Sequence, residues 1–427
     1  MTRQRCSFVL LVSFFAACGG ANESGSSGGL EVVREYVGDT LVVRTVTGSA
    51  WGGNARLVPE VSIGELEGDL EYLFGNIRSL AVASDGTIYV VDAQVPELRA
   101  FSAEGVFQAI LGRPGEGPGE IKQPDGGLAV LSDGRVLVRD PGNARIQVYG
   151  PDGTSLDTWP IRGGFNSSSP FFQTDADAVH TLILLDPGAD VLDWKMGLVR
   201  IGPDGTPGDT LVPPDVGYEA PRLEARHEEG DDRSVSVNTV PFSAGEDWAI
   251  HPAGYFVHGL STEYRIDLLK PTGPVRIERD YEPVPVTRGE KSEEEARTTH
   301  NMRFTEPGWR WNGPPIPDVK PPFRDIFVGR DGRIWVQVHQ AAVEVEDPDY
   351  DPTDPDSVED RWREPVAFDV FREDGTYEGR VTTDLGFGLY PTPVFGETHV
   401  WATTTDDLGV QRVVRFRIEV DSVESAS

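Results

Sequence analysis

The stretch IRSLAVASDGTIYVVDAQVPELRAFSAEG at residues 77–105 recurs 48 residues later, without a gap, as DGGLAVLSDGRVLVRDPGNARIQVYGPDG at residues 125–153. Asp-Gly pairs mark the same turns in both copies, and Asp92 of the first copy aligns with Asp140 of the second. Self-similarity at a fixed spacing is the signature of a repeated structural unit. The fold therefore depends on the structure of one unit and on how the units stack.

Each copy reads as four short strands, which in the first copy are expected at residues 78–83, 87–92, 98–102 and 106–111. Apolar and small or polar residues alternate within these segments, as in antiparallel hairpins. A four-stranded unit of this size cannot bury both of its faces alone, and radial stacking of such units gives a β-propeller.

Further copies are expected at residues 178–211, 254–273 and 390–420, and a copy with an internal insertion runs from 323 to 375. The last copy lacks an outer strand, which residues 55–64 can supply. The sequence therefore predicts an all-β fold: a six-bladed β-propeller of four-stranded antiparallel blades, with its ring closed by an N-terminal strand. Closure removes the exposed strand edges that invite aggregation.

The segment LGRPGEGPGEIKQPDGGLAVLSDGRVLVRDPGNARIQVY, residues 111–149, resembles an NHL repeat, with its glycine-rich lead and its Asn-x-Arg-Ile body. The whole chain is similar to lipid-anchored six-bladed propeller proteins of bacteria with two membranes. This resemblance implies the fold but no shared chemistry. The glycine-rich lead is not expected to bind phosphate, because a strand rather than a helix N-terminus follows it and Glu116 and Glu120 would repel an anion.

The N-terminus has the parts of a secretory signal, with Arg3 and Arg5 before an apolar run, and we expect a signal peptide at residues 1–17. Cys18 follows two alanines and resembles the lipidated cysteine of bacterial lipoproteins, although Phe15 replaces the usual leucine. The sequence thus predicts an exported protein that is lipid-anchored in the cell envelope. Gly19 favours the outer membrane over the inner.

The other expected segments follow from this start. They are a flexible tether at residues 18–29, an N-terminal segment at 30–54, the propeller at 55–420 and a C-terminal tail at 421–427.

The formal net charge is −32, and it becomes −34 without Arg3 and Arg5. Such a surface repels nucleic acid and anionic lipid, so no nucleic-acid partner is expected and the membrane is contacted only through the anchor. Cys6 and Cys18 are the two cysteines of the chain, so the domain carries no disulfide and no cysteine metal site. We expect a monomer.

The long connections fall at positions that propeller topology places on one face, around the mouth of the central channel. Long structured loops usually carry function, which makes this face the predicted binding face. The connections span residues 112–124, 186–194, 212–245, 281–322 and 340–364.

The connection at residues 281–322 is the most elaborate. Ser292 and Glu295 have the spacing of a capping box, which predicts a helix through about Arg303. Trp309 and Trp311 follow among prolines. These aromatic residues suit either a small local hydrophobic core, the preferred interpretation, or a lid over the channel.

Candidate binding residues are those expected at the channel mouth. Arg78, Glu246 and Arg324 align with Gly126 at the starts of first strands, and Arg113 is a further candidate; His258 and His339 lie near the ends of second strands. The arginines would bind a carboxylate or phosphate group, or else pair with local acids such as Glu246 or Asp325.

Metal binding is the weaker expectation. Asp347, Asp349 and Asp351 alternate in an acidic insertion, a spacing that suits Ca²⁺, but the glycine and glutamate of an EF-hand loop are missing. No close pair of histidines has zinc-ligand spacing, although separated histidines can still meet in space. No cofactor is predicted.

Two classes of function fit these observations. The first is a non-enzymatic cell-envelope lipoprotein whose loop-rich propeller face binds a peptide, glycan or protein. The alternative is a metal-dependent, lactonase-like hydrolase or lyase that uses the central channel. The sequence favours the first, because the aligned channel residues do not supply inward acidic and amide groups from several blades.

Overall fold

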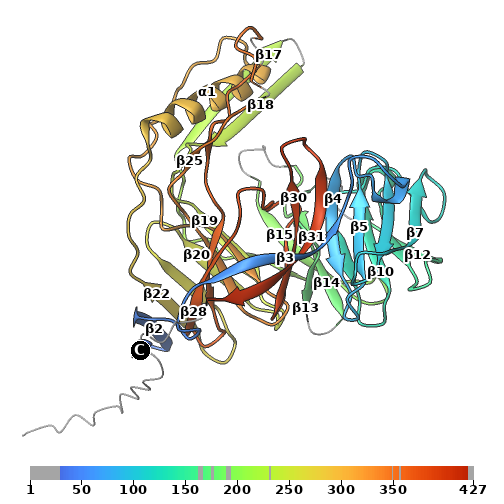
Figure 1. Ribbon diagram of the computed structural model, residues 1–427, viewed down its shortest axis with the longest axis horizontal. Helices are drawn as coiled ribbons and strands as arrows, with labels where there is room; N and C mark the ends of the chain where they lie inside the picture. Colours follow the sequence, from blue (N-terminus) through green and yellow to red (C-terminus); the bar gives the residue numbers. More distant parts are fainter. Residues whose placement is uncertain are drawn as a thin grey trace, which may run out of the picture.

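The computed structural model describes residues 29–161, 167–174, 177–188, 194–229, 232–348, 350–354 and 357–421. The signal peptide, Cys18, Asp349 and most of the C-terminal tail lie outside these residues. The chain forms a six-bladed β-propeller, as predicted (Figure 1).

The first three blades follow one another along the chain. Blade one consists of β4 (Ile77–Val82), β5 (Ile88–Asp92), β6 (Glu97–Phe101) and β7 (Phe107–Pro114), with the short β8 (Glu120–Ile121) beside β7; blade two of β9 (Leu128–Val130), β10 (Val136–Asp140), β11 (Arg145–Tyr149) and β12 (Ser155–Pro160); and blade three of β13 (Phe172–Thr174), β14 (Ala178–Leu184), β15 (Met196–Ile201) and β16 (Pro207–Leu211).

The last three blades complete the ring. Blade four consists of β19 (Glu246–Ile250), β20 (Phe256–Leu260), β21 (Arg265–Leu268) and β22 (Val275–Arg279); blade five of β23 (Phe323–Val328), β24 (Ile334–Val338), β27 (Ala367–Phe371) and β28 (Tyr377–Thr382); and blade six of β29 (Val394–Phe395), β30 (His399–Thr405), β31 (Gln411–Val420) and β3 (Ala55–Ile63).

The outer strand of blade six comes from the N-terminal side of the propeller, which confirms the predicted closure. Strand β3 pairs antiparallel with β31 from Ala55↔Val420 to Ile63↔Val413. It also meets β28 of blade five in parallel at Val381↔Ala55, so the sheets of blades five and six are continuous.

Apolar side chains pack between neighbouring blades. Val91 and Leu98 of blade one, for example, share a buried cluster with Val136 and Val138 of blade two. This packing gives the disulfide-free domain its core.

The repeated glycines occupy a backbone conformation that other residues avoid. Gly86, Gly134, Gly254 and Gly375 all have φ between 83° and 89°, in the left-handed region that glycine enters at no steric cost. Tight turns of this type need glycine, so the Asp-Gly pattern identified the blade hairpins reliably.

The glycine-rich lead is a crossover between blades one and two. The buried Asp140, at the end of β10, accepts hydrogen bonds from the backbone N–H groups of Lys122 and Gln123. Asp92 binds Gly75 and Asn76 in the same way. Each aspartate therefore ties the incoming segment to its own blade.

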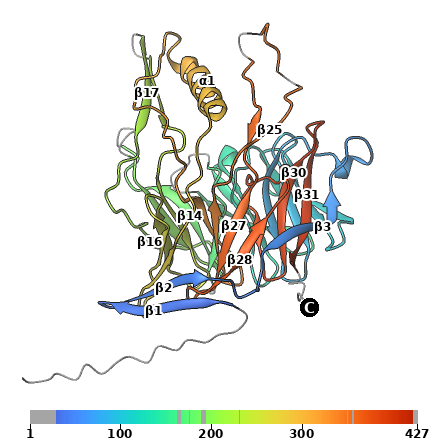
Figure 2. The ribbon, with the colours of Figure 1, turned by 60° about the vertical axis from the view of Figure 1, so that its left-hand side comes forward.

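Two features were not anticipated. Blade three begins with β13, which lies before the expected start of the copy at residue 178. This inner strand has only three residues, so the sequence pattern did not reveal it. A hairpin of β1 (Glu31–Val37) and β2 (Thr40–Thr47) also extends blade four, because β2 pairs in parallel with β22. Figure 2 shows this hairpin on the side of the propeller opposite α1 (Arg288–Thr305).

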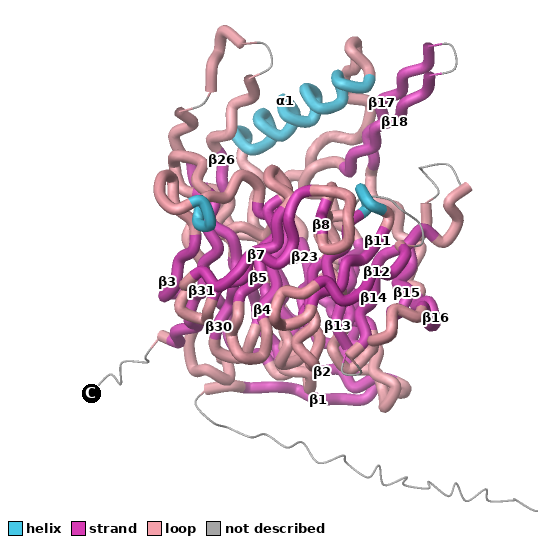
Figure 3. The backbone as a smooth tube through the Cα atoms, turned by 90° about the vertical axis from the view of Figure 1, so that its right-hand side faces the viewer, coloured by secondary structure: helices cyan, strands magenta, loops and turns pink. Residues whose placement is uncertain are grey.

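The three longest connections rise from one face of the propeller, as predicted (Figures 2 and 3). They contain the hairpin of β17 (Arg222–Glu229) and β18 (Asp232–Thr239), the helix α1, and the short pair β25 (Val343–Glu344) and β26 (Trp362–Arg363). We call β17, β18, α1 and residues 306–320 the cap.

The cap has a hydrophobic core of its own, which supports the preferred interpretation of the tryptophan pair. Trp309 and Met302 are fully buried with Leu223 and Ala225 of β17, and Trp311 packs against them.

The predicted start of α1 was wrong. The helix is capped by Thr287, whose side chain accepts the N–H of Glu290, while Glu290 accepts the N–H of Thr287. The true capping box thus lies five residues before the predicted one. Ser292 and Glu295 have the same spacing but lie within the helix.

Candidate functional site

A cavity of about 460 Å³ lies between the cap and the propeller. Its roof is the face of α1 that carries Glu294, Arg297, Thr298 and Asn301. Residues 238–243, which end β18 and lead toward β19, form one side. The starts of β19 and β23 form the other walls, together with His339. We call this cavity the chamber.

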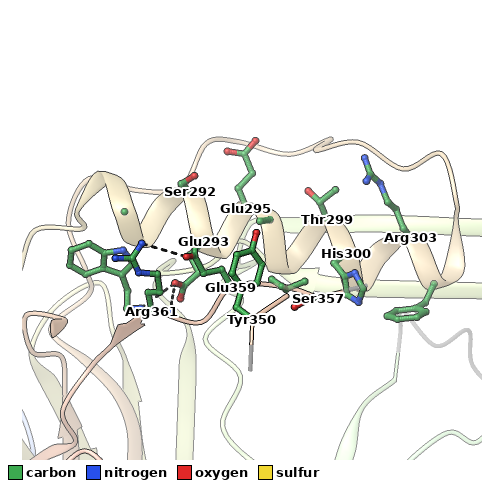
Figure 4. Close-up of a pocket in the computed structure, with 15 residues that line it drawn as sticks. Ser292, Glu293, Glu295, Thr299, His300, Arg303, Tyr350, Ser357, Glu359 and Arg361 are labelled. Carbon is green, nitrogen blue, oxygen red and sulfur yellow. Dashed lines mark hydrogen bonds and ion pairs between the residues drawn. The ribbon is translucent and has the colours of Figure 1, made fainter. Parts of the chain in front are cut away.

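Helix α1 has a polar face on each of two opposite sides. The side of α1 opposite the chamber faces a groove of about 910 Å³, whose far wall is formed by Tyr350 and by residues from Ser357 to Trp362. Figure 4 shows Thr299, His300 and Tyr350 along this groove. A helix that is polar all round has no large apolar face to bury in a core. Because there is a hollow on each of these two sides, the polar side chains of α1 remain in contact with water.

The first turn of α1 is fixed to the propeller by one fully buried cation. The Nζ atom of Lys320 lies 2.7 Å from Glu290 Oε1 and 3.0 Å from Glu364 Oε2, and it donates to the carbonyl oxygen of Gln340 at 2.8 Å. Lys320 therefore joins the cap to the insertion that leaves blade five.

His339 and Phe242 continue this junction to the chamber wall. The Nδ1 atom of His339 lies 3.0 Å from both carboxylate oxygens of Glu364. Burial alone would raise the pKa of Glu364, but the hydrogen bond and charge of His339, with smaller contributions from Gln340 and Lys320, lower it.

Phe242 stands edge-on to the His339 ring and has φ of 58°, a strained value for a bulky residue. Such strain persists only where the surroundings enforce it, and it is frequent at binding sites.

Two acidic residues, Asp247 and Asp325, directly follow the chamber residues Glu246 and Arg324 in the sequence. Asp247 of β19 is partly buried and accepts the backbone N–H of Ile326 in β23. Burial, followed by the charge of Asp325, raises the pKa of Asp247 to about 7. Burial also raises the pKa of Asp325, against the charges of Arg324 and His339.

Arg324 forms an ion pair with Asp325, the next residue in the sequence. This is one of the two interactions that the sequence led us to expect for the arginines. The Nε atom of Arg324 lies 3.5 Å from Asp325 Oδ2, and the side chain of this arginine is 63% exposed.

Glu246 and His258 lie on the opposite side of β19 from Asp247. The Oε1 atom of Glu246 accepts the N–H of Val216 and lies 4.0 Å from Nε2 of the buried His258. Burial lowers the pKa of His258, although the charges of Glu246 and Asp267 oppose the shift. His258 thus lies buried in the middle of β20.

The structure thus brings Glu246, Arg324 and His339 to one chamber, with His258 behind Glu246. Arg78 lies on the inner strand of blade one, where its guanidinium stacks over the ring of Tyr390 at 5.4 Å. Arg113 is separate from all of these. It is exposed on the outer strand β7, because the crossover begins at the periphery of the blade.

Other sequence candidates are engaged locally. Gly126 packs closely against the backbone of Ser168 and Ser169. Asp351 accepts the N–H of Thr353, and Asp347 accepts the N–H of Asp360; Asp349 lies outside the described residues. Among the residues that the structure describes, no group of three or more His, Cys, Asp or Glu side chains has a metal-binding arrangement. Within the same ranges, no helix is long and apolar enough to cross a membrane.

Sequence reasoning missed Lys320 and Asp247, and it named Asp325 only as a possible partner of the arginines. The last two directly follow Glu246 and Arg324, which were identified as starts of inner strands. Alternation along a strand sends neighbouring side chains to opposite sides. The sequence alone did not show which residue of each pair faces the channel, so both residues of each pair were candidates for the channel mouth.

Fold and chamber together define a six-bladed β-propeller with a cap on one face and a cavity between the cap and blades four and five. No protein-family model matches the sequence, and comparison with curated proteins gives no match.

Solved structures resemble the chain at low identity. A DUF4221 family member from Bacteroides vulgatus is 11% identical, with a TM-score of 0.45, over 86% of this chain and 99% of its own. A Bacteroides fragilis protein described as exported is 10% identical, with a TM-score of 0.44, over 89% and 100%. A gluconolactonase from Xanthomonas campestris is 14% identical, with a TM-score of 0.37, over 87% and 99%. At these identities and TM-scores the likeness carries no argument about the function of this chain.

Proposed function

We propose that this protein is a non-catalytic binding protein of the cell envelope and that its ligand occupies the chamber. The observation that carries the proposal is the origin of the chamber walls. Side chains from two separate connections, 212–245 and 281–322, meet residues at the starts of β19 and β23 around one cavity. Connections far apart in the sequence have thus converged on a single space.

The size and the lining of the chamber suit a small ligand or the end of a longer one. Ligand sites commonly occupy roughly 300–1,000 Å³ and place a few polar groups at fixed points. Amide and hydroxyl groups of Asn238, Thr298 and Asn301 line the chamber beside the charged residues. They can hydrogen-bond to a peptide or glycan, as the sequence led us to expect.

Filling the chamber is expected to abolish binding without unfolding the protein. Asn301→Trp adds a large side chain at an exposed helical position that faces the chamber. We expect members of a panel of amino acids, short peptides and oligosaccharides to raise the Tm of the wild-type protein. The same compounds should have no effect on Asn301→Trp.

A matched control for this test is Thr299→Trp, which faces the outer groove instead of the chamber. Failure of every compound to shift the wild-type protein, or equal shifts in Asn301→Trp, would contradict the proposal. Consumption of a compound, measured by mass spectrometry, would instead favour the hydrolase or lyase alternative.

We also propose that Cys18 anchors the protein by lipidation in the outer membrane. The support is the sequence around Phe15–Cys18 and the apolar run before it. Cys18→Ala is expected to move the protein from the membrane pellet to the soluble fraction of the exported proteins. Retention of Cys18→Ala in the membrane fraction would show that another feature is the anchor.

A further inference from the structure

We propose that the chamber binds a neutral saccharide and that the ring nitrogen Nε2 of His339 accepts a hydrogen bond from one of its hydroxyl groups. This inference rests on the proposed function, because it names the class of ligand for the same chamber. It is narrower than the expectation from sequence, which left a peptide, a glycan and a protein open.

The charged side chains that line the chamber balance one another. They are two carboxylates and two guanidinium groups, on Glu246, Glu294, Arg297 and Arg324. Each already has a partner in the protein. Arg297 forms an ion pair with Glu294, and Arg324 forms one with Asp325. Glu246 accepts the N–H of Val216. A charged ligand would therefore lose its hydration and would have to share or break an existing interaction, which is costly.

Neutral polar groups of the lining, by contrast, have no partners. The side-chain amides of Asn238 and Asn301 and the hydroxyl of Thr298 line the chamber. Among the described residues, none of these three groups forms a hydrogen bond within the protein. Thr298 is only 6% exposed, and buried polar groups are rarely left unsatisfied. A ligand with several hydroxyl groups can satisfy all three.

His339 presents a hydrogen-bond acceptor to the same space. Its side chain is 7% exposed, and its Nδ1 atom lies 3.0 Å from both carboxylate oxygens of Glu364. A carboxylate only accepts, so Nδ1 carries the proton, and Nε2 of the neutral ring is left as an acceptor. Within the described residues Nε2 has no hydrogen-bond partner. His339 lines the chamber whereas Glu364 does not, so Nε2 is the ring nitrogen that a ligand can reach.

This mixture of donors and acceptors suits a sugar better than a peptide. A hydroxyl group can donate to His339 Nε2 and can accept from the amide of an asparagine. Apolar side chains of a peptide would need apolar surface, but Val240 and Phe323 of the lining are 1% and 0% exposed. Phe242 is partly exposed and offers one aromatic ring. The C–H groups of a sugar ring can pack against the negative face of such a ring.

Isothermal titration at pH 7 tests the class of ligand. The probes are glucose, galactose and mannose, each compared with the amino sugar and the uronic acid of the same configuration, and trialanine represents a peptide. We expect at least one neutral sugar to bind, and its two charged analogues to bind about 10-fold more weakly or not at all, because their charges find no free counter-charge.

Thr298→Val tests the contact on the roof, since it keeps the shape of the side chain and removes the hydroxyl. We expect it to weaken binding of the neutral sugar by about 10-fold, as loss of one hydrogen bond in a buried site would give. The matched control is Thr299→Val, the same change at the next residue, which faces the outer groove. It should bind the sugar as the wild type does, and equal weakening by both variants would contradict the inference.

The role of His339 is measured without altering the fold. The nitrogen NMR signal of His339 Nε2, identified by its absence from His339→Phe, should move when the sugar is added. A signal that stays in place while the sugar binds would contradict this role. If trialanine or a charged analogue binds as tightly as every neutral sugar, and Asn301→Trp blocks it, the saccharide inference fails while the proposed function stands. If no compound binds, both fail.

Discussion

Replacement of Lys320 by methionine is expected to lower the free energy of unfolding by about 3–5 kcal/mol, the usual cost of removing one partner from a buried ion pair. Methionine has a similar length and fits an apolar site, so lost volume is a small part of the effect. The loss arises because Glu290 and Glu364 keep their charges in a buried site without the Nζ atom that lies 2.7 and 3.0 Å away. Urea unfolding at pH 7 measures the change.

The same substitution at Lys291 provides the control, because Lys291 lies in the same connection and pairs with Asp318, which is 96% exposed. Surface pairs of this type contribute about 0–1 kcal/mol. Equal effects of Lys320→Met and Lys291→Met would contradict the role of Lys320 as the junction between cap and propeller. The effect of Lys320→Met should also shrink as the pH falls, because the charge of Lys320 contributes to the lowered pKa of Glu364 in the folded protein.

Asp247→Asn is expected to have the opposite effect, a gain in stability that grows with pH. The folded protein raises the pKa of Asp247 to about 7 from an ordinary value of 3.8. The contribution of this group is therefore fully present below about pH 4 and is lost as the pH rises through 7. Over that window the unfolded chain ionises while the folded protein keeps its proton.

Between pH 5 and pH 8 the advantage of Asp247→Asn over the wild type should increase by roughly 2–3 kcal/mol, since each unit of pKa difference corresponds to about 1.4 kcal/mol. Urea unfolding at the two pH values measures it. Glu67→Gln, at an exposed carboxylate, should follow the wild type. A parallel pH dependence of Asp247→Asn and wild type would show that Asp247 ionises freely.

The two substitutions therefore have opposite expected effects on stability. Lys320→Met removes the cation that lies between two carboxylates, whereas Asp247→Asn removes a carboxylate whose ionisation is disfavoured by burial.

The propeller could be predicted from sequence because its signals are local. Glycines such as Gly86 and Gly134 sit in turns that other residues avoid, so the repeat reports backbone conformation directly. The closing strand β3 was predictable because the last blade lacked an outer strand. The three-residue inner strand β13 was missed, since so short a segment carries little periodicity.

The chamber could be predicted only in part. Glu246, Arg324 and His339 were identified because they recur at equivalent places in successive blades. Lys320 belongs to a connection without a repeat, and its partners Glu290 and Glu364 are distant in sequence. The helix start was misplaced because Ser292 and Glu295 have the same spacing as Thr287 and Glu290, and spacing alone does not show at which residue the helix begins.

The central claim is that a ligand binds in the chamber, between α1 and the propeller. Cys6 and Cys18 are the two cysteines of the chain, so replacing both by serine allows a single thiol to be placed at Asn301→Cys in the chamber or Thr299→Cys in the outer groove. The rate of thiol alkylation is then measured with and without the panel compound that most raises the Tm of the wild-type protein. The account predicts that this compound slows the reaction at position 301 and leaves it unchanged at position 299. Unchanged rates at both positions, or protection at 299 alone, would contradict it.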